Sequence, residues 1–316
     1  MSVRTNPEPA ECIDCSHVSH LETLIDGRGK DLGGLEVRRV LPAIERRRVG
    51  PFIFFDHFGE PGGRLEGGMQ VRPHPHINLA TVTYLFEGAI LHRDSLGSQQ
   101  VIRPGAVNWM TAGRGIVHSE RMPEEPIENL HGIQVWLGLP TVDEEIDPRF
   151  EHYPAEGMPA LDRDGVRLRV LAGEAYGERS PVKVHSPMFY VDAELAAGAS
   201  LELPSGYAER AAYVAVGELE ALGPDAECVP VSVGQMAVFS GGEGARIKAT
   251  RDARVMLLGG APLDGERHLW WNFVSSQRGR IDEAKAEWLE LTRSGTSRRF
   301  RRVPGDEAEF IPLPER

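Results

Sequence analysis

RPGAVNWMTAGRG (residues 103–115) and SVGQMAVFSGGEG (residues 232–244) are the two stretches that decide the fold, and they lie 129 residues apart. Each has a glycine before a short apolar run and a Gly-x-Gly turn after it. The same offset aligns TYLFEG (83–88) with AYVAVG (212–217) without a gap. Glycines at matched turns indicate matched backbone conformations, which other residues adopt only at a cost. We therefore predict two domains built alike, divided within residues 140–164.

The regions around these stretches also have the pattern of an all-β protein. Short runs rich in β-branched and aromatic residues recur between Gly, Pro and Asn, as in a sandwich or barrel. We predict strands at residues 35–41, 79–86, 89–93, 107–110, 132–139, 166–171, 188–191, 212–216, 236–239 and 255–258.

The end of the chain has a different pattern. Ile281, Ala284, Trp288 and Leu291 are spaced by three and four residues, which predicts a helix over residues 280–291 with one buried face. The prolines that follow cannot lie inside a helix or a central strand, so they predict an extended tail on the surface: Pro304, Pro312 and Pro314.

Composition and charge exclude several classes of protein. The 316 residues carry 35 Lys and Arg against 47 Asp and Glu, a net charge of −12 that repels nucleic acid and anionic lipid. No apolar run approaches the ~18 residues that a membrane span needs, and the first residues lack a secretory signal. Three cysteines form no disulfide framework, so we expect a cytoplasmic protein with no direct nucleic-acid or membrane partner.

One neighbourhood places histidines as metal ligands. His74-Pro-His76 and His118-Ser-Glu120 each pair two ligand residues at i and i+2, which share one face of an extended strand. Three imidazoles and one carboxylate suit a divalent ion such as iron, manganese, cobalt, nickel or zinc. An octahedral ion would keep two positions for water, dioxygen or substrate.

The internal repeat shows that these four residues behave as a unit. At the 129-residue offset the four candidate ligands are all replaced, while the turn glycines remain. The counterparts of His74, His76, His118 and Glu120 are Leu203, Ser205, Ile247 and Ala249. Residues kept for packing would have no reason to change together, so we predict one metal site, in the first domain only.

Several segments together resemble the pirin family of bicupin proteins. They are GPFIFFDHF (50–58), RPHPHINLATVTYLFEG (72–88), HRDSLG (92–97), RPGAVNWMTAGRGIVHSE (103–120) and HGIQVWLGLP (131–140). The resemblance implies an all-β fold of two tandem cupin (β-barrel or jelly-roll) domains with a C-terminal helix and tail. It also implies one Fe(II) ion held by His74, His76, His118 and Glu120, and a second cupin without metal.

This resemblance also implies domain limits. We expect a flexible N-terminal segment at 1–28, the metal-binding cupin at 29–150 and the metal-free cupin at 151–265. Residues 266–316 would form the helix and the tail, packed on the barrels.

The activity implied by the resemblance is that of a quercetin 2,3-dioxygenase, an oxidoreductase acting on a flavonol and dioxygen. Glu120 would serve as ligand and as catalytic base. The alternative is an iron- and redox-sensing protein that regulates a protein partner such as a transcription factor. This chain reads HPHINLATV where many pirins read HPHRGFETV, and Ala80 stands where metal cupins often place a glutamate.

Four secondary features have two interpretations each. Cys12, Cys15, His17 and His20 belong to a mobile tail or to a thiol metal or redox site. His92 and Asp94 form a solvated hairpin end or a pair that orients a ligand imidazole. An apolar group lines a substrate pocket or belongs in part to the core: Phe52, Phe54, Trp109 and Met110. The basic run at 298–302 pairs with the acidic surface or contacts nucleic acid.

Overall fold

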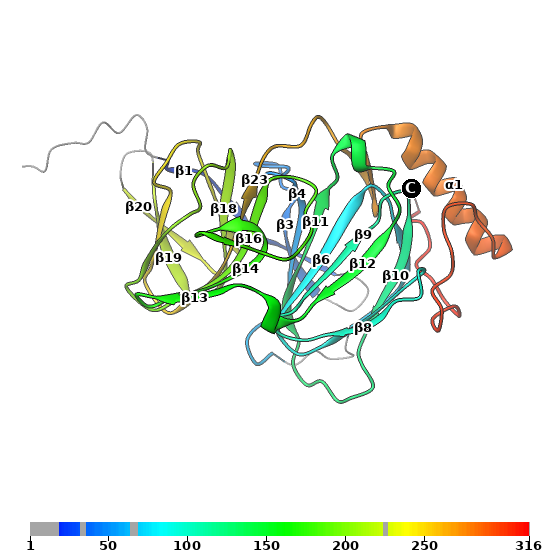
Figure 1. Cartoon of the computed structure of the whole chain (residues 1–316), viewed down its shortest axis with the longest axis horizontal. Coiled ribbons are helices and arrows are strands. Elements are labelled where there is room, and N and C mark those ends of the chain that lie inside the picture. Colours follow the sequence, from blue (N-terminus) through cyan, green and yellow to red (C-terminus); the bar gives the residue numbers. More distant parts are fainter. Residues whose placement is uncertain (1–18, 32–35, 64–68, 224–226, 316) are drawn as a thin grey trace, which may run out of the picture.

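The computed structural model describes residues 19–31, 36–63, 69–223 and 227–315 of the chain (Figure 1). They form two β-rich domains that lie side by side, and one long helix at the end of the molecule remote from the second domain. None of the helices in this part of the chain is long and apolar enough to cross a membrane.

The first domain is built from two antiparallel sheets. The large sheet has the strand order β12-β9-β6-β11-β4-β3-β2, and the small sheet has the order β5-β10-β7-β8. In chain order these strands are β2 (Arg28–Asp31), β3 (Glu36–Leu41), β4 (Phe52–Phe58), β5 (Gln70–His76), β6 (Leu79–Glu87), β7 (Ile90–Asp94), β8 (Gln99–Ile102), β9 (Val107–Thr111), β10 (Ile116–Arg121), β11 (His131–Gly138) and β12 (Arg149–Tyr153).

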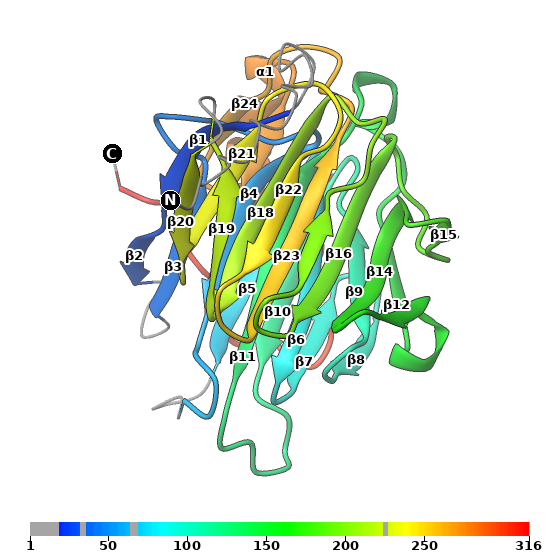
Figure 2. The same cartoon turned by 90° about the vertical axis from the view of Figure 1, so that its left-hand side faces the viewer.

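The second domain repeats this plan. Its large sheet has the order β1-β21-β18-β23-β16-β14-β13, with β15 paired to β14, and its small sheet has the order β17-β22-β19-β20. The strands are β1 (Leu21–Asp26), β13 (Ala160–Arg163), β14 (Val166–Ala175), β15 (Glu178–Arg179), β16 (Met188–Leu195), β17 (Ser200–Glu202), β18 (Glu209–Val216), β19 (Glu218–Leu222), β20 (Cys228–Ser232), β21 (Gln235–Phe239), β22 (Arg246–Ala249) and β23 (Ala253–Gly260). Figure 2 shows β16, β23 and β18 running side by side.

All the predicted strands overlap observed strands. The sequence repeat also corresponds to a structural repeat of the strands. Strands β6, β7, β8, β9 and β10 occupy the places in the first domain that β18, β19, β20, β21 and β22 occupy in the second. The short 3-10 helices Thr141–Asp143 and Ala155–Gly157 lie in the predicted connection between the domains.

The edges of the two large sheets differ from the expected domain limits. Strand β1 pairs with β21 of the second domain, so the expectation of a flexible segment over residues 1–28 is wrong for Leu21–Asp26. Its side chains alternate, and Leu21 and Ile25 are buried in apolar cores. Strand β12 pairs with β9 and carries the first large sheet to Tyr153, three residues past the expected limit at 150.

The largest of the apolar cores lies between the two large sheets, which pack face to face. One apolar cluster includes Val82 and Val135 from the first domain together with Met256 and Leu258 from the second. Aromatic pairs cross the boundary: the rings of Phe52 and Tyr190 lie 5.6 Å apart, and those of Phe55 and Tyr213 lie 4.6 Å apart. This interface fixes the outer, smaller sheet of the first domain on a rigid base.

The C-terminal segment covers the open side of the first domain. It contains the hairpin β24 (His268–Trp270) and β25 (Phe273–Ser275), followed by α1 (Arg278–Ser294). The predicted apolar face of the helix is buried, as expected: Ile281, Ala284, Trp288 and Leu291. It packs with Ile77 and Val117, and the backbone N–H of Ile311 in the extended tail donates to the Pro73 carbonyl at 2.8 Å.

The basic run at 298–302 pairs with acidic side chains, as one of its two interpretations predicts. Arg299 is largely buried and lies within 4 Å of Glu145, Glu283 and Glu287. Phe300 lies in the apolar cluster beneath the tail.

Candidate metal centre

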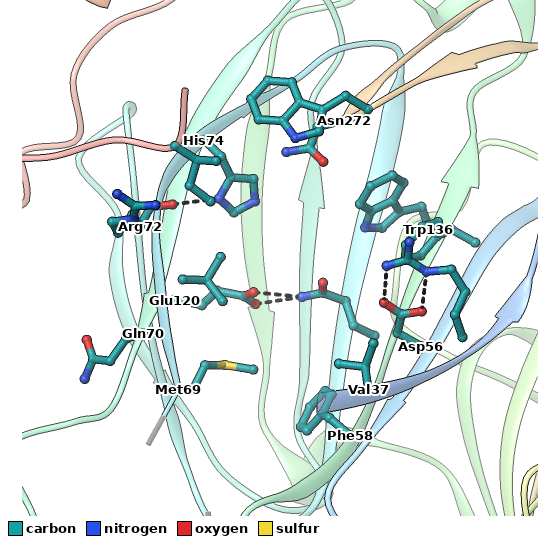
Figure 3. Close-up of a pocket in the computed structure, with 16 residues that line it drawn as sticks. Val37, Asp56, Phe58, Met69, Gln70, Arg72, His74, Glu120, Trp136 and Asn272 are labelled. Carbon is teal, nitrogen blue, oxygen red and sulfur yellow. Dashed lines mark hydrogen bonds and ion pairs between the residues drawn. The ribbon is translucent and has the colours of Figure 1, made fainter. Parts of the chain in front are cut away.

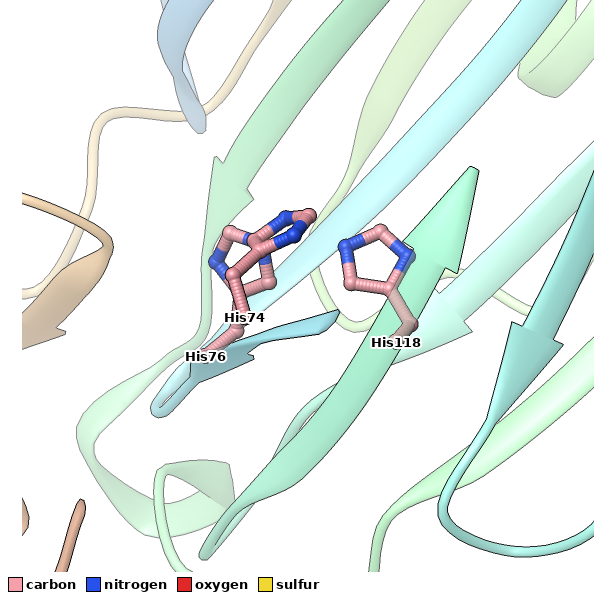
Figure 4. A group of neighbouring side chains, drawn as sticks. All are labelled: His74, His76 and His118. Atoms are coloured by element: carbon pink, nitrogen blue, oxygen red, sulfur yellow. The ribbon is translucent and has the colours of Figure 1, made fainter. Parts of the chain in front are cut away.

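Three histidines converge on the small sheet of the first domain (Figure 4). His74 and His76 lie on one face of β5, as the alternation predicts, and His118 of β10 is the direct cross-strand partner of His74. One ring nitrogen from each histidine lies within 4.8 Å of the others. The ring centroids of His74 and His118 are 4.3 Å apart, and those of His76 and His118 are 5.0 Å apart.

Hydrogen bonds fix which nitrogen each ring can offer. The Nδ1 atom of His74 lies 2.9 Å from the Arg72 carbonyl, and the Nδ1 atom of His76 lies 3.1 Å from the Asn272 carbonyl. Because a carbonyl only accepts, each Nδ1 carries the proton and each Nε2 keeps a free lone pair. Both ring nitrogens of His118 are buried without any hydrogen-bond partner among the described residues.

The protonation state of the three imidazoles suits the binding of a cation. Burial lowers the pKa of all three imidazoles, to about 4 for His74 and well below the usual value for His76 and His118. Mutual repulsion between the rings adds to this effect. The histidines are therefore neutral at pH 7, the form that binds metal. Buried polar atoms are nearly always hydrogen-bonded, so the orphaned His118 nitrogens fit a site built for an ion.

Glu120 lies on the same strand as His118 but is held apart from this cluster. The pairing of β10 with β5 changes register between the two residues. The Gln134 side-chain N–H group donates to both Glu120 carboxylate oxygens, at 2.8 and 3.0 Å, and the Thr83 hydroxyl donates at 3.2 Å. Burial raises the pKa of the Glu120 carboxyl, an effect that the Gln134 hydrogen bonds partly offset. The carboxylate faces the same cavity as His74 (Figure 3).

The second-copy positions explain why the described residues of that domain form no such cluster. Leu203, Ile247 and Ala249 are fully buried and belong to the apolar core of the second domain. Ser205 is exposed. Apolar packing thus occupies the positions equivalent to His74 and His118, and the position equivalent to His76 is an exposed serine.

His92 and Asp94 form a buried pair beside the cluster. The His92 Nε2 atom lies 3.1 Å from the Asp94 carboxylate, and both side chains are almost completely shielded from solvent. The His92 ring stacks on Phe150 at 4.2 Å and lies 5.3 Å from the ring of His118. A solvated hairpin end is therefore wrong here, and the pair instead forms part of the wall behind His118.

A cavity of about 400 Å³ opens beside His74 and Glu120 (Figure 3). Phe54 and Trp136 stack on its wall at 3.9 Å, and the Arg39 guanidinium lies 4.1 Å above the Phe54 ring. Arg39 also forms a bidentate ion pair with the Asp56 carboxylate. Of the predicted aromatic and sulfur-containing group only Phe54 lines the cavity, whereas the others are core: Phe52, Trp109 and Met110.

Sequence reasoning missed several residues of this site. Gln134 and Thr83 are polar residues inside apolar strands, a signal that alternation could have used. Trp271, Asn272 and Ile311 reach the cavity from the C-terminal segment, and no local pattern indicates them.

The candidate thiol cluster lies mostly outside the described residues, since Cys12, Cys15 and His17 precede residue 19. His20 is described and contacts Ser240. Cys228 is a free, exposed thiol at the start of β20.

The duplicated sheets, with one histidine cluster inside the first domain, define the chain as a bicupin protein. The pirin family profile matches residues 34–137, and the profile of the pirin C-terminal cupin domain matches residues 190–293. The chain belongs to the pirin family.

Its relatives include bacterial and animal proteins. A pirin-like protein of Caulobacter vibrioides is 49% identical, covering 93% of this chain and 100% of the relative. A Pseudomonas aeruginosa protein named "Putative quercetin 2,3-dioxygenase" is 38% identical over 86% of this chain and 84% of its own, and human pirin is 35% identical over 73% and 78%. The crystal structure of a quercetin 2,3-dioxygenase from Acinetobacter baumannii aligns with a TM-score of 0.83 at 33% identity, covering 93% of this chain and 95% of that one.

Proposed function

We propose that this protein is a metal-dependent dioxygenase that acts on a flavonol such as quercetin, with Fe(II) as its metal. The observation that carries the proposal is the convergence of three neutral histidines beside a buried carboxylate on the wall of a cavity of about 400 Å³. That volume suits an aromatic molecule of flavonol size. The names of the Pseudomonas and Acinetobacter relatives support the choice of reaction.

In this proposal His74, His76 and His118 hold the metal, which when bound supplies the redox chemistry that dioxygen requires. Glu120 completes the set as a fourth ligand if its Oε2 atom exchanges the bond to Gln134 for the metal, while Oε1 keeps the bonds from Gln134 and Thr83. The neutral imidazoles and the two orphaned nitrogens of His118 fit this assignment.

The protein's own side chains prepare the substrate. Glu120 accepts the proton of the flavonol 3-hydroxyl, and its raised pKa makes it a stronger base than an exposed carboxylate. Gln134 and Thr83 hold the carboxylate in one orientation while it does so. The stacked Phe54 and Trp136 rings offer an apolar wall to a planar ring system and exclude water from it.

The test is anaerobic loading with Fe(II), addition of quercetin and then admission of air. Loss of the flavonol absorbance together with release of carbon monoxide is the expected result. His76→Ala should lose both the metal and the turnover. His152→Ala removes a partly buried histidine that bonds Asn108 outside the cavity, so it should retain both. Iron-loaded wild type that leaves quercetin unchanged would refute the substrate assignment.

A further inference from the structure

The turn of the C-terminal hairpin forms part of the cavity wall. Strands β24 and β25 pair Trp270 with Phe273, so that Trp271 and Asn272 are the two central residues of the turn. Both line the cavity. The Asn272 carbonyl accepts the hydrogen bond from the His76 Nδ1 atom at 3.1 Å, which anchors the turn at the histidine cluster.

Trp271 has an unusual backbone conformation. Its φ is 52°, in the left-handed region, whereas Asn272 has no positive φ. Positive φ at the first central position alone is the pattern of a type II′ hairpin turn, in which glycine is the usual residue. A bulky aromatic residue with positive φ is rare, and such strain concentrates at functional sites.

Packing within the protein covers only part of the Trp271 indole. The indole is half-buried, packs against the apolar cluster beneath α1, and meets the rings of Phe273 and Trp270 edge-on, with centroid distances of 5.5 Å and 6.2 Å. Its N–H group makes no hydrogen bond within the described part of the chain and is not among the buried orphans. The side chain therefore presents an aromatic surface and an unused donor at the edge of the cavity.

The neighbouring Trp270 gives a comparison within the same hairpin. Its ring lies under the Lys285 ammonium at 4.2 Å and stacks on Phe273 at 6.2 Å with a small interplanar angle. It does not line the cavity, and its φ is not positive. Both tryptophans thus pack against the same apolar cluster, but Trp270 carries the contact with Lys285 of α1, and of the two only Trp271 lines the cavity.

We propose that Trp271 is a specificity-determining residue that packs against the ring system of a planar aromatic substrate. The left-handed backbone places the indole in the cavity wall, and its N–H group is available to a hydroxyl or carbonyl oxygen of that substrate. The proposal deepens the proposed function, on which it rests, by assigning a residue outside the first cupin to substrate recognition.

The binding test uses quercetin and the iron-loaded full chain under nitrogen, followed by isothermal titration calorimetry. An aromatic contact of this kind predicts that Trp271→Ala and Trp271→Gly weaken binding by about 3- to 10-fold. Trp271→Phe keeps a ring and should lose less. Trp270→Ala is the matched control, and it should lower the melting temperature while changing affinity by less than about twofold. Wild-type affinity in Trp271→Ala, or an equal loss in Trp270→Ala, would overturn the proposal.

The melting temperatures of the two variants separate the backbone strain at Trp271 from the loss of the indole. Trp271→Gly and Trp271→Ala both remove the indole, but only glycine adopts the left-handed conformation without strain. The glycine variant should therefore melt about 1 to 4 °C above the alanine variant. Equal melting temperatures would mean that no strain holds the residue in place, and would overturn the positioning argument.

The two proposals can fail separately. Wild type that binds quercetin but never consumes it would remove the dioxygenase function and leave the role of Trp271 intact. Wild type that consumes quercetin with an unchanged KM in Trp271→Ala would do the reverse. Wild type that does not bind quercetin would overturn both.

Discussion

His118 shows how a single residue can lower the stability of the free protein for the sake of a ligand. Two buried ring nitrogens without partners cost about 1–3 kcal/mol each. The second domain has Ile247 at the equivalent position, in a dry apolar core. An ion at the proposed site would remove the cost of one of the two nitrogens.

This contrast predicts the effect of His118→Ile. The variant should bind no metal, and its free energy of unfolding should exceed that of metal-free wild type by about 2–6 kcal/mol, because both orphaned nitrogens are gone. Urea unfolding in the presence of a chelator measures the difference. Saturating Fe(II) should stabilise wild type alone. A variant less stable than the metal-free wild type would show that the site carries no such cost.

A second prediction for a single residue concerns Glu120. Glu120→Gln keeps an oxygen that can coordinate weakly but cannot accept a proton at neutral pH. Turnover should fall by about 10²- to 10⁴-fold while most of the metal is retained. Metal analysis and the quercetin assay on one preparation test this. Parallel loss of metal and turnover would indicate that Glu120 acts only as a ligand.

Part of this site could be predicted from the sequence alone. The i and i+2 spacing places His74 and His76 on one face, because strand alternation is local. The separation of Glu120 from the histidines depends on a register change between β10 and β5, which no spacing within β10 reveals. Asn272 lies 196 residues from the histidine that it orients, beyond the reach of any local pattern.

At the scale of elements, the matched glycines do more than permit a turn. Gly88 and Gly217 have φ of 85° and 80° at the equivalent hairpins. A Cβ atom would lie 2.2 Å from the Asn129 carbonyl oxygen at the first and 2.1 Å from the Asp252 carbonyl oxygen at the second. The repeat therefore preserves both a dihedral angle and a close backbone approach.

For this reason Gly217→Ala should lower the free energy of unfolding by more than the strain of a positive φ alone would. Gly177 has a φ of 83°, and a Cβ atom there would meet no heavy atom within 4 Å, so Gly177→Ala should lose only about 1 kcal/mol of unfolding free energy. Gly217→Ala should lose about 1–3 kcal/mol more, because the backbone must shift. Urea unfolding of the two variants measures the gap. Equal losses would contradict the close-approach argument.

The sheet that β1 joins could not be predicted, for a related reason. Alternation identifies which side chains of β1 are buried, but it cannot identify the sheet that buries them. Strand β1 precedes the first domain in the chain and completes the second, pairing across more than 200 residues. Whole strands and turn glycines are encoded locally, whereas their partners are set by the global packing.

At the scale of the whole molecule, a polar chain crosses the apolar interface between the large sheets. The His57 Nδ1 atom lies 2.7 Å from the Tyr213 hydroxyl, and the His57 Nε2 atom lies 2.7 Å from the His131 Nε2 atom. Only one proton fits between the two Nε2 atoms, so one imidazole donates and the other accepts. Burial lowers the pKa of His57 to about 3 and that of His131 to about 4, with repulsion from Arg38 and Arg254 adding to the effect.

This chain predicts that acid loosens the contact between the domains. The folded-state pKa of His57 lies below its unfolded value of about 6.5, so the unfolded chain takes up protons first as the pH falls. The stabilising contribution is complete above pH 6.5 and is lost progressively down to about pH 3. At pH 5 the loss from His57 alone is about 2 kcal/mol.

His57→Gln provides the test, because an amide can bond Tyr213 and His131 but does not titrate. Between pH 7.5 and pH 5, wild type should lose about 2 kcal/mol more unfolding free energy than the variant. The histidines that do not contact His57 are common to both proteins, so their contributions cancel, and the difference reports the His57–His131 pair. Glu87 acts in the opposite direction on His131, since its negative charge raises the pKa of that ring. Identical pH dependences would mean that His57 accepts a proton in the folded state, and that the interface opens without losing the fold.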